Sequence, residues 1–244
     1  ALLLETKLYS DGMHNTSIRL ALGSARGPNA ILALFYTFNH LFYERSELAA
    51  IQPLEGAVHT ALSFSEEGLD VINQADESFF AAVFGDEKMD IQGRSNNAKQ
   101  NEILFGNLCE LDPVHLYELY PDGKKVAHLL AKCEQAQNSI LTRGLYGTWI
   151  FLREQFLVLL DPQNTKAFAP YLTASGPTPA EVATMQKLKP AFDVVYQFYN
   201  NFVTHFISYS NAVYKESAVS EISFFNSVRF ILIGVCFGLI FLSY

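Results

Sequence analysis

The chain has 244 residues, of which 50% are hydrophobic and 17% charged, and its formal net charge at pH 7 is −8. This composition excludes an intrinsically disordered chain, because disorder requires few apolar residues and a high charge. The acidic balance provides no basic surface for a phosphate backbone, so we expect no nucleic-acid partner.

Helical periodicity runs along nearly the whole sequence, and alternating strand-like segments are scarce. We therefore predict an all-α fold, an elongated bundle of the four-helix type that leads into a transmembrane helix. The first helical region is expected from Leu2 to Ala49, with interruptions at Asp11-Gly12 and Gly27-Pro28.

The middle of the chain is divided by turn signals. Helices are expected near 65–84 and 97–108, with a polar loop between them and one helical turn at 114–119. A long helix is expected over 124–160, because apolar residues recur along it at steps of three and four. Three prolines then exclude helix from most of 161–177.

The last helix has a clear start signal in Thr178-Pro179-Ala180-Glu181, where Thr178 and Glu181 predict a capping box. Pro190 lies inside the pattern and should kink this helix or delay its start. The apolar positions that follow alternate in steps of four and three, the spacing of a bundle seam: Leu188, Phe192, Val195, Tyr199, Phe202, Phe206, Tyr209 and Val213.

The same helix is expected to continue into the apolar end of the chain. The run from Phe230 to Leu242 is uncharged but shorter than the roughly 20 residues of a full membrane span. Because the chain begins with Ala1 and ends inside this run, we expect a piece of a longer protein that stops within a transmembrane helix. We assign 1–10 to the end of a preceding span, 11–217 to an extracytoplasmic domain, and 218–244 to the start of the transmembrane helix.

Two cysteines outside the apolar end, Cys109 and Cys133, form a disulfide if the domain faces an oxidising compartment, and are otherwise two buried thiols. The glycosylation sequon at Asn15 also fits an outside location. We expect a membrane protein, at the plasma membrane, whose bulk is extracytoplasmic and which contacts membrane lipid.

No motif for catalysis stands out. A phosphate-binding glycine loop and a nucleophile elbow are both missing, and the six histidines lack metal-ligand spacing. We therefore expect no enzymatic activity, metal or cofactor in this segment, although a catalytic output domain elsewhere in the full-length protein is compatible with it.

Two arginines are candidates for a ligand site. Arg143 falls on or beside the inward stripe of its expected helix, where a charge is costly unless it is paired. It forms a salt bridge to Asp193 or Glu154, reaches water at the edge of the stripe, or binds an anion with its planar guanidinium group. Arg26 lies in a second apolar stretch and is the other candidate for such an anion site.

The surroundings of both arginines resemble a known family. The segment ALGSARGPNA around Arg26 and the segment LTRGLYG around Arg143 are similar to the two motifs of nitrate- and nitrite-sensing (NIT) domains. These are helical extracytoplasmic bundles of transmembrane receptors in which the two motif arginines hold the anion. The resemblance implies that Arg26 and Arg143 bind it here, although Ala25 and Thr142 replace the glutamate that precedes each arginine in the family.

A group of aromatic residues offers another interpretation, either an apolar ligand pocket or the bundle core: Trp149, Tyr196, Phe198, Tyr199, Phe202 and Phe206. We predict that the chain is the ligand-sensing domain of a homodimeric transmembrane signalling receptor. It would bind a small molecule or anion between two helices and transmit a helix shift through the membrane. The alternative is a structural or assembly subunit of a membrane complex that senses no ligand.

Overall fold

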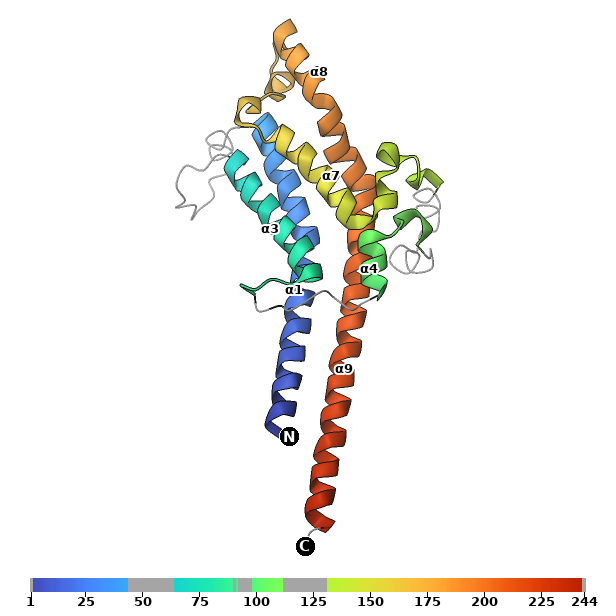
Figure 1. The fold of residues 1–244 in the computed structure, drawn as a ribbon. Coiled ribbons are helices and arrows are strands. Elements are labelled where there is room, and N and C mark those ends of the chain that lie inside the picture. The colour runs from blue at the N-terminus through green and yellow to red at the C-terminus, as the bar shows by residue number, and fades with distance from the viewer. Residues whose placement is uncertain (1, 44–63, 90, 92–97, 112–130, 243–244) are drawn as a thin grey trace.

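The computed structural model describes residues 2–43, 64–89, 91, 98–111 and 131–242, and most of these residues are helical (Figure 1). They contain no strand, only one isolated antiparallel bridge between Asp86 and Ile91. The predicted all-α fold is confirmed. The expected turn at 114–119 and the first part of the helix expected at 124–160 lie outside the described residues.

The helices follow one another in this order: α1 (Leu2–Phe42), α3 (Phe64–Phe84), α4 (Ala98–Phe105), η1 (Leu108–Glu110), η2 (Ala136–Arg143), α7 (Gly144–Leu159), η3 (Pro162–Asn164), η4 (Ala169–Leu172), α8 (Pro179–Asp193), η5 (Val194–Val203) and α9 (Thr204–Leu242). The helix α1 packs against both α3 and α9, while α7 packs against α4 and α8. In Figure 1, α1 and α9 run side by side below the other helices, and both ends of the chain lie at that end of the molecule.

The two interruptions expected in the first helix are wrong, because α1 is continuous from Leu2 to Phe42 with Pro28 inside it. Its glycines serve helix packing instead of turns. A methyl group placed on Gly12 would lie 2.6 Å from the Phe225 ring, and one on Gly23 would lie 3.2 Å from the Tyr214 ring. Because these two glycines have no side chain, aromatic rings of α9 pack directly against the backbone of α1.

The single helix expected over 124–160 is also wrong in its described part. Three consecutive residues, Gln137, Asn138 and Ser139, have positive φ angles of 46°, 56° and 64°. Left-handed backbone cannot continue a right-handed helix, so α7 starts only at Gly144, which has a φ of 77°. This break separates the Arg143 region from the stripe that a continuous helix would have formed.

The start of the last helix is confirmed. Thr178 and Glu181 form the predicted capping box, and Pro179 occupies the first turn of α8. Pro190 remains inside α8, and the irregularity follows it as the π-helical segment η5. The described seam residues are buried, except that Phe192 is half-buried, and Phe202 lies outside the described side chains.

The upper and lower parts of α9 differ in burial. Down to Ala218 the helix contributes to the core, whereas Val219, Phe224, Phe230 and Phe237 are each at least 60% exposed. Among the described residues, one helix segment, Thr204–Val235, is long and apolar enough to cross a membrane, and little of its most apolar stretch is buried. The part of α9 beyond Ala218 therefore exposes large apolar side chains of its own that no other described part of the protein covers.

A disulfide joins Cys109, in η1, to Cys133, ahead of η2, with their Cα atoms 5.6 Å apart. Cys133 is fully buried in the main core. The bond fixes the end of the α4–η1 segment to the start of the η2–α7 segment, which pack against each other.

Candidate functional site

Arg26 is the largest charged side chain in the interior of the described bundle, with 0% of its surface exposed. It lies near the middle of α1, where this helix packs against α3 and α9. Its Nε donates to the carbonyl oxygen of Ser78 at 3.3 Å, and its Nη1 donates to the hydroxyl of Ser210 at 3.2 Å. The guanidinium group therefore connects the first helix to both of its neighbours.

Two aromatic rings cover this guanidinium group. Its Cζ atom lies 5.0 Å from the centroid of Phe79 and 5.1 Å from that of Tyr214. Such cation–π contacts stabilise a desolvated charge by roughly 1–2 kcal/mol each. Burial still lowers the pKa of the Arg26 guanidinium, while the nearby Tyr214 hydroxyl acts in the opposite direction.

The charge of Arg26 has no carboxylate partner among the described residues, since its contacts are a carbonyl, a hydroxyl and two rings. Its Nη2 atom is buried and makes no hydrogen bond within the described bundle. A buried arginine that lacks a counter-ion is costly, because neither water nor an acid compensates its charge. This arrangement leaves a strong donor available to an anion.

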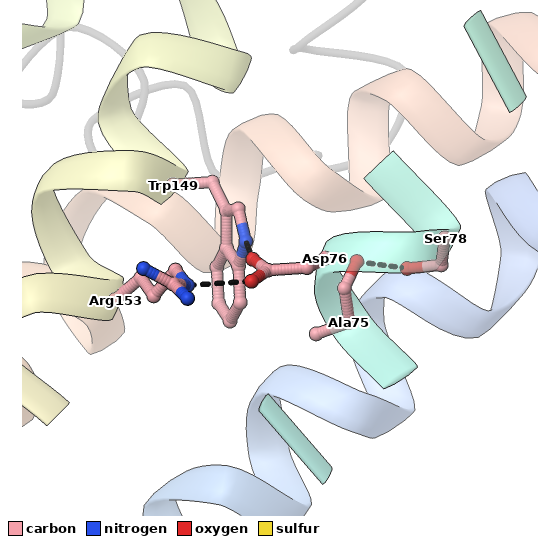
Figure 2. Close-up of polar contacts among 5 residues, drawn as sticks. All are labelled: Ala75, Asp76, Ser78, Trp149 and Arg153. Atoms are coloured by element: carbon pink, nitrogen blue, oxygen red, sulfur yellow. Dashed lines mark hydrogen bonds and ion pairs between the residues drawn. The ribbon is translucent and has the colours of Figure 1, made fainter. Parts of the chain in front are cut away.

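A second layer supports the site through Phe79. The Trp149 indole stacks on Phe79, with the ring centroids 5.1 Å apart and the planes 12° apart. Figure 2 shows that Trp149 and Arg153, both on α7, point toward Asp76 on α3. Trp149 Nε1 donates to Asp76 Oδ1 at 2.7 Å, and Arg153 Nε donates to Oδ2 at 2.5 Å. These contacts fix α7 to α3 next to the Phe79 ring that covers Arg26.

The hydroxyl partner of Arg26 is also fixed by a neighbouring helix. Gln100, fully buried on α4, donates its side-chain amide to the backbone carbonyl of Ser210 at 3.0 Å. On the other side, the Tyr214 hydroxyl donates to the carbonyl of Ala82, near the end of α3. Helices α1, α3, α4 and α9 thus all contribute to the surroundings of one guanidinium group.

Arg143 occupies a different environment. It is exposed at the end of η2, immediately before α7, and Asp193 is paired with Lys189 instead. Exposure agrees with the interpretation that this side chain reaches water. The structure therefore does not bring Arg26 and Arg143 into one enclosed site, because one is fully buried between α1, α3 and α9 and the other lies at the surface.

The predicted aromatic group divides in the same way. Trp149, Tyr199 and Phe206 belong to the core, whereas Tyr196 is 48% exposed, and the side chains of Phe198 and Phe202 lie outside the described part. Burial raises the pKa of the Tyr199 hydroxyl to about 12. Core packing accounts for the three buried rings, so this group does not by itself indicate a ligand.

Three supporting residues could not be recognised from the sequence. Asp76 and Gln100 gave no motif, because their roles depend on partners 73 and 110 positions away. Arg19 belonged to no motif either, yet its Nη1 donates to the carbonyl oxygens of Ala82 and Val83 at 2.8 and 3.3 Å. It caps carbonyl groups in the last turn of α3 by hydrogen bonds, which is a structural role.

Within the described residues, no group of three or more His, Cys, Asp or Glu side chains is arranged to hold a metal ion. The Arg26 site offers one unpaired guanidinium donor and two aromatic faces among the described residues. Comparison of the chain with protein families, with curated proteins and with solved structures gave no match, so the resemblance of the two arginine motifs to NIT domains stays a prediction.

Proposed function

We propose that residues 11–217 form the extracytoplasmic ligand-sensing domain of a transmembrane signalling receptor, and that Arg26 binds a small anion there. The observation that carries the proposal is a fully buried guanidinium group with an unpaired Nη2 and no described carboxylate partner. Arginine in this state gains most from a bound anion, because charge-assisted hydrogen bonds are strongest away from water.

The position of Arg26 supports a signalling role. Its hydroxyl partner, Ser210, and one of its two covering rings, Tyr214, both belong to α9. An anion that draws the guanidinium group toward itself would alter these contacts and so favour another position of α9 relative to α1. Because α9 continues without a break to Leu242, the shift reaches its exposed apolar part.

Membrane attachment and an outside location rest on separate features. The exposed apolar residues of α9 beyond Ala218 support insertion of this part into lipid. The disulfide between Cys109 and Cys133 supports an oxidising compartment for the bundle, because such bonds are rare in the cytosol.

The test is anion-dependent thermal stabilisation of the purified chain in detergent, measured with chloride, nitrate, formate and hydrogencarbonate at constant ionic strength. A ligand that binds only the folded state raises Tm with its concentration. We expect at least one of these anions to stabilise the wild type, an Arg26→Met variant to lose the response, and an Arg143→Met variant to keep it. Equal responses in all three proteins would contradict the proposal.

An assembly role without a ligand is the second candidate, and one observation favours it. On α1, Ile31, Phe35 and Phe38 are 54%, 51% and 39% exposed and follow one another at helical spacing. Such an apolar stripe suits a partner helix, including that of a second copy. If Phe35→Ser changes the sedimentation mass and no anion stabilises the wild type, the assembly role is preferred.

A further inference from the structure

We infer that the Arg26 site selects an oxyanion that itself carries one O–H group, of which hydrogencarbonate is the smallest. The inference rests on the proposed anion-sensing function and adds the chemical class of the ligand. It follows from two unsatisfied atoms of opposite character that lie on the packed faces of α1 and α9.

The first atom is a donor. Arginine has five N–H groups, and the contacts of Arg26 use one on Nε and one on Nη1. Nη2 carries two more and is buried without a hydrogen-bond partner in the described bundle. Because Phe79 and Tyr214 lie against the guanidinium group, a ligand must approach at the Nη2 end.

The second atom is an acceptor. Asn211 Oδ1 is buried and also has no hydrogen-bond partner within the described residues. A methyl group placed on Gly27 would lie 3.8 Å from Asn211 Nδ2, so this amide rests against α1 at the residue after Arg26. On α9, Asn211 directly follows Ser210, the hydroxyl partner of Arg26. The unsatisfied donor thus belongs to Arg26 on α1. The unsatisfied acceptor belongs to Asn211 on α9, next to the residue that contacts Arg26.

A water molecule could satisfy both atoms, but it would leave the charge of Arg26 without a counter-ion. An anion without hydrogen, such as nitrate or chloride, would neutralise the charge but turn a lone pair toward Asn211 Oδ1. An oxyanion with one O–H group satisfies all three requirements, since its charged oxygen accepts from Nη2 and its hydroxyl donates to Oδ1.

Enclosure limits the size of this ligand. Arg26 is 0% exposed, and the Asn211 oxygen is buried, so the ligand must be held between the helices. Hydrogencarbonate has four heavy atoms, and small hydroxycarboxylates such as glycolate offer the same pair of groups at a slightly larger size. The shared chemistry is a carboxylate-type oxygen and a hydroxyl on one small anion.

The test compares matched pairs of anions by the fluorescence of Trp149, the only tryptophan of the chain, which stacks on the Phe79 ring beside Arg26. Hydrogencarbonate is compared with nitrate, because both are planar, singly charged and of similar size, and only hydrogencarbonate carries an O–H group. Glycolate is compared with acetate, because only glycolate carries a hydroxyl. Titrations use the full chain in detergent, in sealed samples at one mildly alkaline pH.

We expect hydrogencarbonate to bind about tenfold more tightly than nitrate, the effect of one well-placed hydrogen bond. A preference for glycolate over acetate without a preference for hydrogencarbonate identifies the larger ligand of the same class. In Asn211→Leu, which keeps the volume and removes the acceptor, the preference should disappear while nitrate affinity is retained.

Equal affinity for the members of both pairs in the wild type overturns the inference and leaves the proposed anion sensing intact. The same holds if Asn211→Leu folds and keeps the full preference. If none of the four anions binds, the inference fails, and the anion-dependent Tm measurements with chloride and formate decide the proposed function separately. The wild-type ratios decide the matter even if the variant does not fold.

Discussion

Trp149 stacks on Phe79 and also donates its indole N–H to Asp76, two contacts that lie on the same face of α3. One side chain of α7 thereby fixes both the ring that covers Arg26 and the carboxylate that pairs with Arg153. Trp149 therefore links α7 to the Phe79 side of the candidate site through two separate contacts.

Replacing Trp149 by Phe should lower the free energy of unfolding by about 1–3 kcal/mol, because Asp76 Oδ1 loses its donor while the ring stacking is largely kept. Urea denaturation followed by far-UV circular dichroism measures this change, since the variant has no tryptophan. Tyr171→Phe, at an aromatic residue that is 59% exposed, is the control and should leave the midpoint unchanged. An equal midpoint in Trp149→Phe would show that the indole bond contributes nothing.

Arg26 should contribute little to stability. Its guanidinium group is desolvated without a carboxylate, so Arg26→Met should change the free energy of unfolding by less than about 1 kcal/mol, or increase it. Arg26→Ala should cost about 2–4 kcal/mol, because it also leaves a cavity between α1, α3 and α9. Both are measured by urea denaturation in the absence of added anions. A large loss in Arg26→Met would instead assign this arginine a structural role.

Two glycines with positive φ angles should respond very differently to alanine. Gly144 has a φ of 77°, and a Cβ there would lie 2.3 Å from the backbone oxygen of Leu104. Gly176 has a φ of 67° and no atom within 4 Å of such a Cβ. Gly176→Ala should cost about 1 kcal/mol for its positive φ. Gly144→Ala adds the strain of a φ and ψ of 77° and 173°, which essentially only glycine adopts, and an overpacking cost of about 1–3 kcal/mol. Thermal unfolding of the pair separates the two effects, and equal losses would contradict the close α4–α7 contact.

Stability should fall in mildly acidic solution because of His40. This ring is 1% exposed, its Nε2 lies 3.0 Å from the Asp161 carbonyl oxygen, and burial lowers its pKa below 6.5. The unfolded chain therefore binds the proton more readily, so this contribution is fully present above about pH 6.5 and decreases as the pH falls toward the lower folded-state pKa.

His40→Gln should flatten this part of the stability–pH profile. His14 is exposed, so His14→Gln should leave the slope as in the wild type. Chemical denaturation at a series of pH values gives both profiles. A slope that persists in His40→Gln would assign the acid sensitivity to other groups.

The sequence predicted those features that depend on local pattern. The capping box at Thr178 and the seam from Leu188 to Val213 are encoded within a few residues, and the structure contains both. The continuity of α1 could not be predicted in this way, because Gly12 and Pro28 signal turns in sequence, and only the structure shows that Gly12 makes room for the Phe225 ring of α9.

The candidate site was predictable only in part. Arg26 was singled out as an arginine in an apolar stretch, but its partners Ser78 and Ser210 lie 52 and 184 positions away and belong to no motif. The continuous helix expected to carry Arg143 on or beside its inward stripe was wrong, because three residues before it adopt left-handed backbone, although none of them is glycine. Such positions are rare for side-chain-bearing residues, so composition gives no signal for them.

The uninterrupted course of α9 has a mechanical consequence. Ser210 contacts Arg26, and Phe237 lies 27 residues further along the same helix, about 40 Å away at 1.5 Å per residue. A tilt of only about 5° at the level of Ser210 would displace Phe237 sideways by roughly 3.5 Å. The long helix is thus a lever arm, in which an adjustment too small to disturb the packed core becomes a movement as large as a side chain at its far end.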